Sequence, residues 1–108
     1  MVVVISCSHF PDDERIYHKE IKAILEEGYF VKYFTLAESI VDMNDKNIVH
    51  INYNKLKNSL KNYLMLVEGE LMNDPPKIIH IHEPELFPLA IKLKKRFNTK
   101  IIYDVHED

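Results

Sequence analysis

The sequence predicts an α/β domain of three layers, in which helices cover a mostly parallel sheet of about five strands. Short apolar runs rich in β-branched residues alternate along the chain with longer stretches whose apolar residues recur at helical spacing. Strands separated by helices of this length pair in parallel through right-handed crossovers. A length of 108 residues and a hydrophobic content of 46% fit one domain with a core of its own.

Five segments have the composition of strands. They cover residues 2–5, 29–36, 47–52, 77–82 and 100–105. The first is a continuous apolar run, as expected of a strand that is covered on both faces. Residues 37–46 are polar and irregular, so we expect a loop between the second and third strands.

A helix is predicted between the first two strands. It follows the turn at Pro11, where Asp12 or Asp13 can cap its N-terminus, and Gly28 is placed to cap its C-terminus. Its apolar positions repeat at helical spacing and are Tyr17, Ile21, Ile24 and Leu25.

Two further helices precede the fourth and fifth strands. The first of these has the clearest amphipathic pattern, with an apolar face of Leu56, Leu60, Tyr63, Leu64, Val67 and Leu71. The sequence Asn-Asp-Pro-Pro at residues 73–76 ends it. The last helix has Pro84 and Pro88 in its first turns, where a missing N–H costs little. Its apolar face is Leu86, Leu89, Ala90, Leu93 and Phe97.

Charge, glycine and cysteine contents exclude several functional classes. A net charge of -3 does not indicate nucleic-acid binding. Two glycines are too few for a Walker loop or a G-x-G-x-x-G motif. The chain has no run of about 18 apolar residues, and its first residues lack the length and charge of a signal peptide. The single cysteine, Cys7, cannot form an internal disulfide. These features predict a cytoplasmic protein.

Polar residues follow three of the predicted strands, in the stretches "SHFPDDER", "HIHEPE" and "DVHED". In an open parallel sheet, ligands bind beyond the carboxyl ends of the strands, where the strand order reverses. If these three strands are neighbours, the residues that approach one another are His9, His82, Glu83 and His106. Together with Arg15 they can form a polar cleft for hydroxyl-rich or phosphorylated ligands, because a sugar needs several fixed donors and acceptors.

The same residues also have plainer interpretations. His80 alternates with isoleucines and can be a sheet-face histidine, Glu83 can favour the start of a helix, and His106 can be a frayed terminal residue. A metal site is another alternative, because His80 and His82 share one face of a strand. His106 and Asp108 could complete it. The chain has no H-x-E-x-x-H pattern and no cysteine pair, so we assign no metal and no cofactor.

Two long segments carry a resemblance to a known family. They read "SHFPDDERIYHKEIKAILEEGYFVKYF" and "IIHIHEPELFPLAIKLKKRFNTKIIYDVHED". They resemble the N-terminal domain of family-4 glycosyltransferases of the GT-B architecture, with the closest likeness to the branch that makes bacterial cell-surface polysaccharides. The resemblance covers nearly the whole chain. Its specific parts are residues 10–31 and 77–108, and residues 38–73 are not distinctive.

The resemblance implies one of two Rossmann-like domains that face each other across a cleft, and we expect the strand order 3-2-1-4-5. Residues 1–108 would form the N-terminal, acceptor-side domain, and the C-terminal domain that binds the donor would lie outside this chain. The complete enzyme would move a sugar, with retention, from a nucleotide-sugar to a glycan or lipid-linked acceptor. The nucleotide-sugar would be a co-substrate, with no further cofactor, and the full-length protein could bind the cytoplasmic face of the membrane peripherally.

The resemblance also implies roles for single residues. His106 matches the histidine that reaches toward the transferred sugar, so we expect it to be catalytic. Glu83 matches the glutamate of "HEPE" at the cleft. The expected substrate-binding residues are His9, Asp13, Arg15, His82, Glu83 and Glu107. Many members of the family have a glycine-rich loop after the first strand where this chain has "FPDDER", so backbone contacts of that loop with phosphate are not carried over.

Three functional hypotheses follow. The first is the N-terminal part of a retaining glycosyltransferase, inactive alone. The second is a free-standing flavodoxin-like ligand-binding or interaction module, which a gene ending at Asp108 would favour. The third is a metal-dependent hydrolase that uses His80, His82 and His106, and it predicts zinc or manganese in the purified chain. We also expect self-association, because a sheet without its full cover exposes edges and apolar faces.

Overall fold

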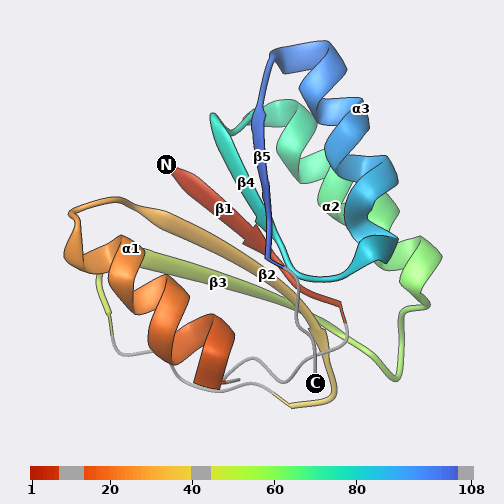
Figure 1. Cartoon of the computed structure of the whole chain (residues 1–108). Helices are drawn as coiled ribbons and strands as arrows, with labels where there is room; N and C mark the ends of the chain where they lie inside the picture. Colours follow the sequence, from red (N-terminus) through yellow and green to blue (C-terminus); the bar gives the residue numbers. More distant parts are fainter. Residues whose placement is uncertain (8–13, 40–44, 105–108) are drawn as a thin grey trace.

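The computed structural model describes residues 1–7, 14–39 and 45–104, and of residues 14–16 it describes the backbone alone. Over this part of the chain the elements follow one another as β1, η1, α1, β2, β3, α2, β4, η2, α3 and β5 (Figure 1). This is the order predicted from the sequence, with no helix between β2 and β3 among the described residues.

Five parallel strands form one sheet in the order β3-β2-β1-β4-β5, so the predicted α/β class and strand order are confirmed. Their bounds are β1 (Val2–Ile5), β2 (Val31–Ala37), β3 (Ile48–Asn54), β4 (Ile78–Ile81) and β5 (Lys100–Tyr103). β1 is the central strand, since Val4 pairs with Tyr33 of β2 on one side and with His80 of β4 on the other. Its central position explains why every residue of β1 is apolar and buried.

The first helix starts with a π-helical segment, η1 (Glu14–Ile21), and continues directly as α1 (Lys22–Glu26). Its C-terminal end is a Schellman motif. The Gly28 N–H donates to the carbonyl of Leu25, and the Tyr29 N–H donates to the carbonyl of Ile24. Gly28 has a φ of 90°, which glycine adopts without strain, so its predicted role at the end of this helix is confirmed.

Helix α2 (Leu60–Asn73) begins after Ser59, whose hydroxyl accepts a hydrogen bond from the Asn62 N–H at 3.1 Å. The predicted apolar face is confirmed for Tyr63, Val67 and Leu71, which are buried, but not for Leu60, the first residue of the helix, which is exposed. The prediction was wrong for Leu56, which lies in the preceding turn and is 75% exposed. The Asn54 side chain accepts a hydrogen bond from the Leu56 N–H at 2.8 Å and so favours a turn where the apolar spacing favoured a helix.

The short 3₁₀ helix η2 (Pro84–Leu86) continues into α3 (Phe87–Phe97). The end of α3 is marked by Asn98, which has a left-handed conformation with a φ of 57° and donates its N–H to the carbonyl of Lys94. The Thr99 hydroxyl then donates to the carbonyl of Pro76 at 2.9 Å, which fixes the start of β5 beside the start of β4.

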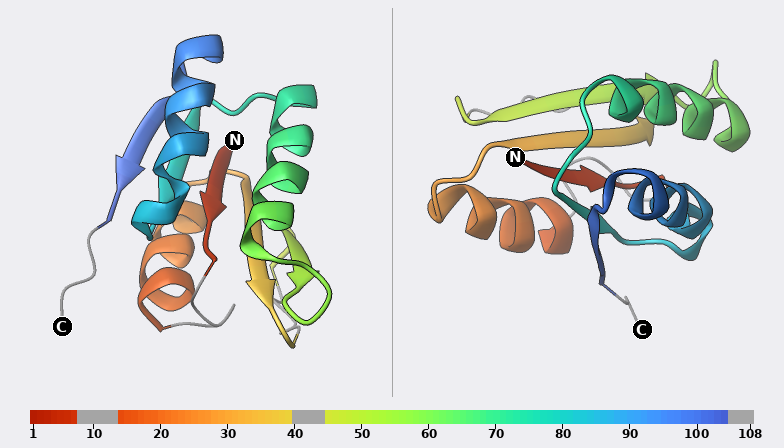
Figure 2. Two further views of the ribbon diagram at one scale, coloured as in Figure 1. Left: turned by 90° about the vertical axis from the view of Figure 1, so that its right-hand side faces the viewer. Right: turned by 90° about the horizontal axis from the view of Figure 1, so that it is seen from above.

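The helices cover the sheet on both faces (Figures 1 and 2). Helices α2 and α3 pack on one face, against a core that includes Val3, Ile5, Phe34, Ile79 and Ile81. The helix formed by η1 and α1 packs on the other face, against a smaller core that includes Val2, Val4, Val31 and Tyr33. Alternate residues of each central strand therefore belong to different cores.

Candidate functional site

The carboxyl ends of β1 and β4 lie side by side, at the point where the strand order reverses. From β1 the chain runs to β2 and β3 on one side of the sheet and later to β4 and β5 on the other. Open parallel sheets bind their ligands at such a point. Ser6 and Cys7 follow β1 there, and His82 and Glu83 follow β4.

The structure brings two of the predicted site residues, His82 and Glu83, to this point. Their exposed fractions are 3% and 4%, so both are set into the end of the sheet. His9, Asp13, His106 and Glu107 lie outside the described residues, and so does the side chain of Arg15. The expected approach of His9 and His106 to His82 therefore stays a prediction.

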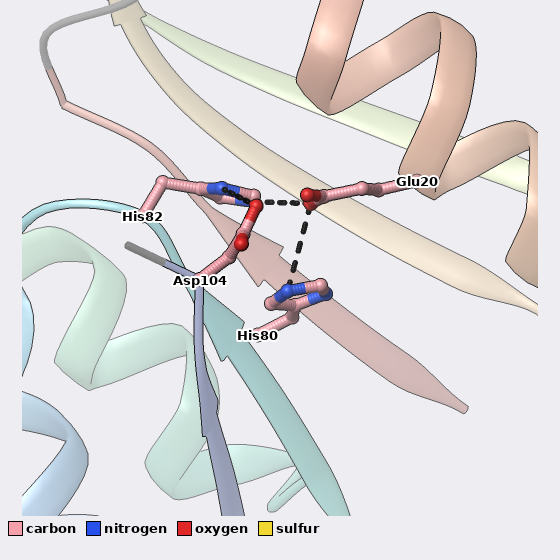
Figure 3. A group of neighbouring side chains, drawn as sticks. All are labelled: Glu20, His80, His82 and Asp104. Carbon is pink, nitrogen blue, oxygen red and sulfur yellow. Dashed lines mark ion pairs between the residues drawn. The ribbon is translucent and has the colours of Figure 1, made fainter. Parts of the chain in front are cut away.

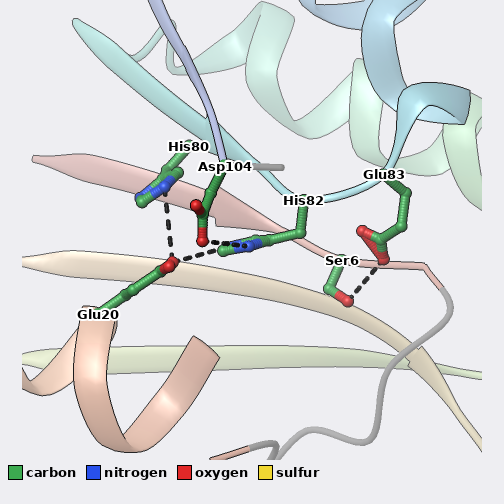
Figure 4. Close-up of polar contacts among 6 residues, drawn as sticks. All are labelled: Ser6, Glu20, His80, His82, Glu83 and Asp104. Atoms are coloured by element: carbon green, nitrogen blue, oxygen red, sulfur yellow. Dashed lines mark hydrogen bonds and ion pairs between the residues drawn. The ribbon is translucent and has the colours of Figure 1, made fainter. Parts of the chain in front are cut away.

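Glu83 fastens the end of β1 to the segment that follows β4. Its Oε1 atom accepts a hydrogen bond from the Ser6 hydroxyl at 2.9 Å (Figure 4). The same atom accepts a second hydrogen bond from the Cys7 N–H at 2.7 Å. Glu83 precedes η2, but its side chain makes no capping hydrogen bond to that helix. The Tyr63 hydroxyl of α2 adds a third contact by donating to the Ser6 carbonyl at 2.7 Å. The end of β1 is thus held by two side chains from distant parts of the sequence.

Burial keeps two groups near this point protonated. It acts with the carboxylates of Glu83 and Glu85 to raise the pKa of the Cys7 thiol from 9.0 to about 12. Burial also raises the pKa of the Tyr63 hydroxyl well above its ordinary value, which suits a donor to the Ser6 carbonyl. A thiol protonated at neutral pH is a weak nucleophile.

Four side chains meet on the face of the sheet that α1 covers: Glu20, His80, His82 and Asp104 (Figure 3). The Glu20 Oε2 atom lies 3.5 Å from His80 Nε2 and 3.3 Å from His82 Nε2. The Asp104 Oδ2 atom lies 3.9 Å from His82 Nδ1. The two imidazole rings stack with their centroids 4.8 Å apart. We call these four residues the histidine–carboxylate cluster.

Strand alternation explains how the histidine–carboxylate cluster forms. Ile79 and Ile81 point into the core under α2 and α3, so His80 and His82 point to the opposite face. Glu20 reaches them from η1. Asp104 follows β5 directly, and its N–H donates to the carbonyl of Ile81 at 3.1 Å, which sets it beside His82. The cluster therefore joins three elements that are distant in the sequence.

Sequence reasoning found half of this cluster. It paired His80 and His82 on one strand face, as the structure has them, but it expected His106 and Asp108 to complete a metal site, and both lie outside the described residues. It missed Glu20 and Asp104. Glu20 lies between the inward-facing Tyr17 and Ile24 on the helix, and a carboxylate inside an apolar stripe is a signal that could have identified it. Asp104 is the first polar residue after β5, where the carboxyl-end rule applies equally.

The described residues thus define an α/β domain with a Rossmann-like parallel sheet and polar side chains at its carboxyl edge. No protein-family model, curated protein or solved structure matches the chain. Of the helices in the described residues, none combines the length and the apolar character needed to cross a membrane.

Proposed function

We propose that this chain is the acceptor-side domain of a retaining glycosyltransferase of the GT-B architecture. The observation that carries the proposal is the position of His82 and Glu83, directly after β4 at the point where the strand order reverses. The sequence resemblance places the cleft glutamate of the family at the same Glu83. The proposal also accounts for the polar stretch that follows β1, because it would line the acceptor side of the same cleft.

The described contacts support different roles for the residues that hold the end of β1 and the residues that follow it. Glu83 and Tyr63 hold the end of β1 rigidly, so the segment after Cys7 starts from a fixed position. That segment contains His9, Asp13 and Arg15, which we propose bind the hydroxyl groups of the acceptor. Rigid support of this kind favours catalysis, because small displacements of substrate-positioning groups cost large factors in rate.

Catalysis in this proposal falls to His106, two residues after Asp104. Retaining transfer builds positive charge on the sugar ring and negative charge on the leaving phosphate. An imidazole on the acceptor-side wall can hydrogen-bond the sugar as this charge develops. The leaving phosphate needs cations or helix N-termini on the opposite wall, which a second domain would supply. Glu107 would bind the sugar beside His106.

The proposal is tested by sugar transfer with and without a second domain. We expect the parent reading frame to continue by roughly 200 residues, a typical domain length. The 108-residue chain should release no nucleoside diphosphate from UDP- or GDP-sugars in the presence of saccharide acceptors, whereas the longer protein should do so. In the longer protein, His106→Ala should lower the rate about 100-fold or more, and His18→Ala, which changes an exposed histidine of η1, should not.

Two results would contradict the proposal. Transfer by the isolated 108-residue chain would show that the two-domain requirement is wrong. A reading frame that ends at Asp108, together with no transfer, would favour the flavodoxin-like binding module instead.

A further inference from the structure

We propose that the histidine–carboxylate cluster is a Zn²⁺ site in which Glu20, His80, His82 and Asp104 each supply one ligand. One nitrogen from each histidine and one oxygen from each carboxylate lie within 4.8 Å of one another. The site would fasten the helix formed by η1 and α1 to β4 and to the end of β5. It does not depend on sugar transfer, so either proposal can fail without the other.

Two of the separations between donor atoms, both made by Glu20, fit a shared cation better than direct hydrogen bonds. A hydrogen bond between an imidazolium and a carboxylate is typically about 2.7–2.9 Å long. Glu20 Oε2 lies 3.5 Å from His80 Nε2 and 3.3 Å from His82 Nε2. Ligand bonds of about 2.0–2.1 Å in a tetrahedral zinc site place neighbouring ligand atoms about 3.3 Å apart. The distances from Glu20 Oε2 to the two histidine nitrogens are therefore close to the distances between neighbouring ligand atoms in a tetrahedral zinc site.

Charge points to a cation as well. The carboxylates of Glu20 and Asp104 both belong to the cluster, and their side chains are only 19% and 22% exposed. Two charged carboxylates this close together repel each other. A divalent cation between them would balance both charges, and the neutral imidazoles of His80 and His82 would complete its coordination.

The donor set selects the kind of metal and its role. Imidazole nitrogens favour zinc and similar transition metals, whereas Mg²⁺ and Ca²⁺ favour sites made of oxygen alone. Four protein ligands also fill a tetrahedral zinc site and leave no position for a reacting water. The cluster therefore fits a structural metal better than the hydrolytic one that a site of His80, His82 and His106 would have required.

The first experiment is a metal titration of the chain without a polyhistidine tag. The protein is stripped of metal with EDTA, dialysed, and titrated with Zn²⁺ in competition with a chromophoric chelator. We expect one equivalent of Zn²⁺ per chain and no competition from millimolar Mg²⁺. Co²⁺ in place of Zn²⁺ should give the intense visible absorption of tetrahedral coordination. Absence of a stoichiometric site, or an octahedral Co²⁺ spectrum, would overturn the proposal.

Conservative variants then test the four ligands. Glu20→Gln and Asp104→Asn keep the side-chain shapes and should each weaken Zn²⁺ binding by more than the roughly 10- to 100-fold typical of losing an outer-shell partner. His80→Asn should do the same. His18→Ala is the matched control, because it removes an exposed histidine from the same helix as Glu20 and should leave the affinity unchanged.

Thermal unfolding provides a readout for variants that bind poorly. Zn²⁺ should raise the unfolding midpoint of the native chain and of His18→Ala, and it should not raise that of Glu20→Gln. Equal affinity in the native chain and in Glu20→Gln, or loss of binding in His18→Ala, would assign the metal to the surface and overturn the proposal.

Discussion

The thiol of Cys7 links the end of β1 to the pH dependence of stability. Its pKa rises from an ordinary value of 9.0 to about 12 in the folded chain, because the thiol is buried beside the carboxylates of Glu83 and Glu85. Between these values the unfolded chain loses a proton that the folded chain keeps, so the stability should fall as the pH rises above 9. We expect this group to contribute a loss of about 1.4 kcal/mol for each pH unit up to about 12.

The measurement is urea unfolding at several pH values between 8 and 11, for the native chain and for Cys7→Ala. Tyr53, whose pKa burial also raises, acts in both proteins and therefore cancels in the comparison. Burial raises the pKa of Tyr63 in both proteins, and the charge of the Cys7 thiolate raises it further in the native chain alone, so the variant removes that contribution together with the thiol. Cys7→Ala should show a shallower fall above pH 9. Parallel pH profiles of the two proteins would contradict the raised pKa of the thiol.

The position of a site residue was predictable from the sequence only where the local pattern determines the face to which its side chain points. The alternation of His80 and His82 with isoleucines placed both on one strand face, and the structure has them there. The partners of Glu83 were not predictable, because Ser6 and Cys7 lie 77 and 76 residues away along the chain. Glu20 and Asp104 carried local signals, but their common partners were not predictable, since these depend on which elements the tertiary fold brings together.

At the scale of elements, we expect glycine-to-alanine substitutions at the two glycines of the chain to change the free energy of unfolding in opposite directions. Gly28 ends the first helix with a φ of 90°, so Gly28→Ala should lower the free energy of unfolding by about 1–2 kcal/mol. Gly69 lies inside α2, where an added methyl group meets nothing within 4 Å. Gly69→Ala should therefore raise the free energy of unfolding by about 0.5–1 kcal/mol.

Urea unfolding of the two variants at pH 7 checks this pair. An added methyl group at Gly28 also meets nothing within 4 Å, so a loss of stability there reports the backbone conformation and not a clash. If both substitutions stabilised the protein, the left-handed conformation of Gly28 would be wrong.

Elements with strong periodicity and clear stop signals were predictable almost to the residue. β1 matches its predicted bounds, and α2 ends at Asn73, at the start of the predicted stop signal. The start of α2 was less predictable, because the apolar spacing continues back to Leu56 while the side chains of Asn54 and Ser59 set the turn and the cap. Polar side chains that bind the backbone decide such a boundary, and the apolar pattern alone does not show them.

At the scale of the whole molecule, the edges of the sheet bear on self-association, which stays a prediction. Among the described residues β3 and β5 are the outer strands, and each carries an exposed apolar side chain, Val49 and Ile102, at 46% and 40%. Outer strands with exposed apolar residues favour pairing with another chain. We therefore expect a dimer or larger species in size-exclusion chromatography with light scattering.

A matched pair of variants tests which surface is responsible. Ile102→Lys puts a charge on β5 and should shift the species toward monomer. Ile91→Lys changes an isoleucine of α3 with a similar exposure, 44%, and should leave the mass unchanged. A monomer in the native chain at all concentrations would contradict the prediction.

The central place of β1 also has a consequence for synthesis on the ribosome. β1 is made before the other four strands of the sheet, and its second neighbour, β4, begins only at Ile78. At about 5–20 residues per second, this strand waits on the order of ten seconds for its partner. During that time β2 is the only one of its two sheet neighbours that has been made, so the backbone groups along its other edge lack their partner strand. We therefore expect chaperones to bind the nascent chain until residue 81, the last residue of β4, has left the exit tunnel.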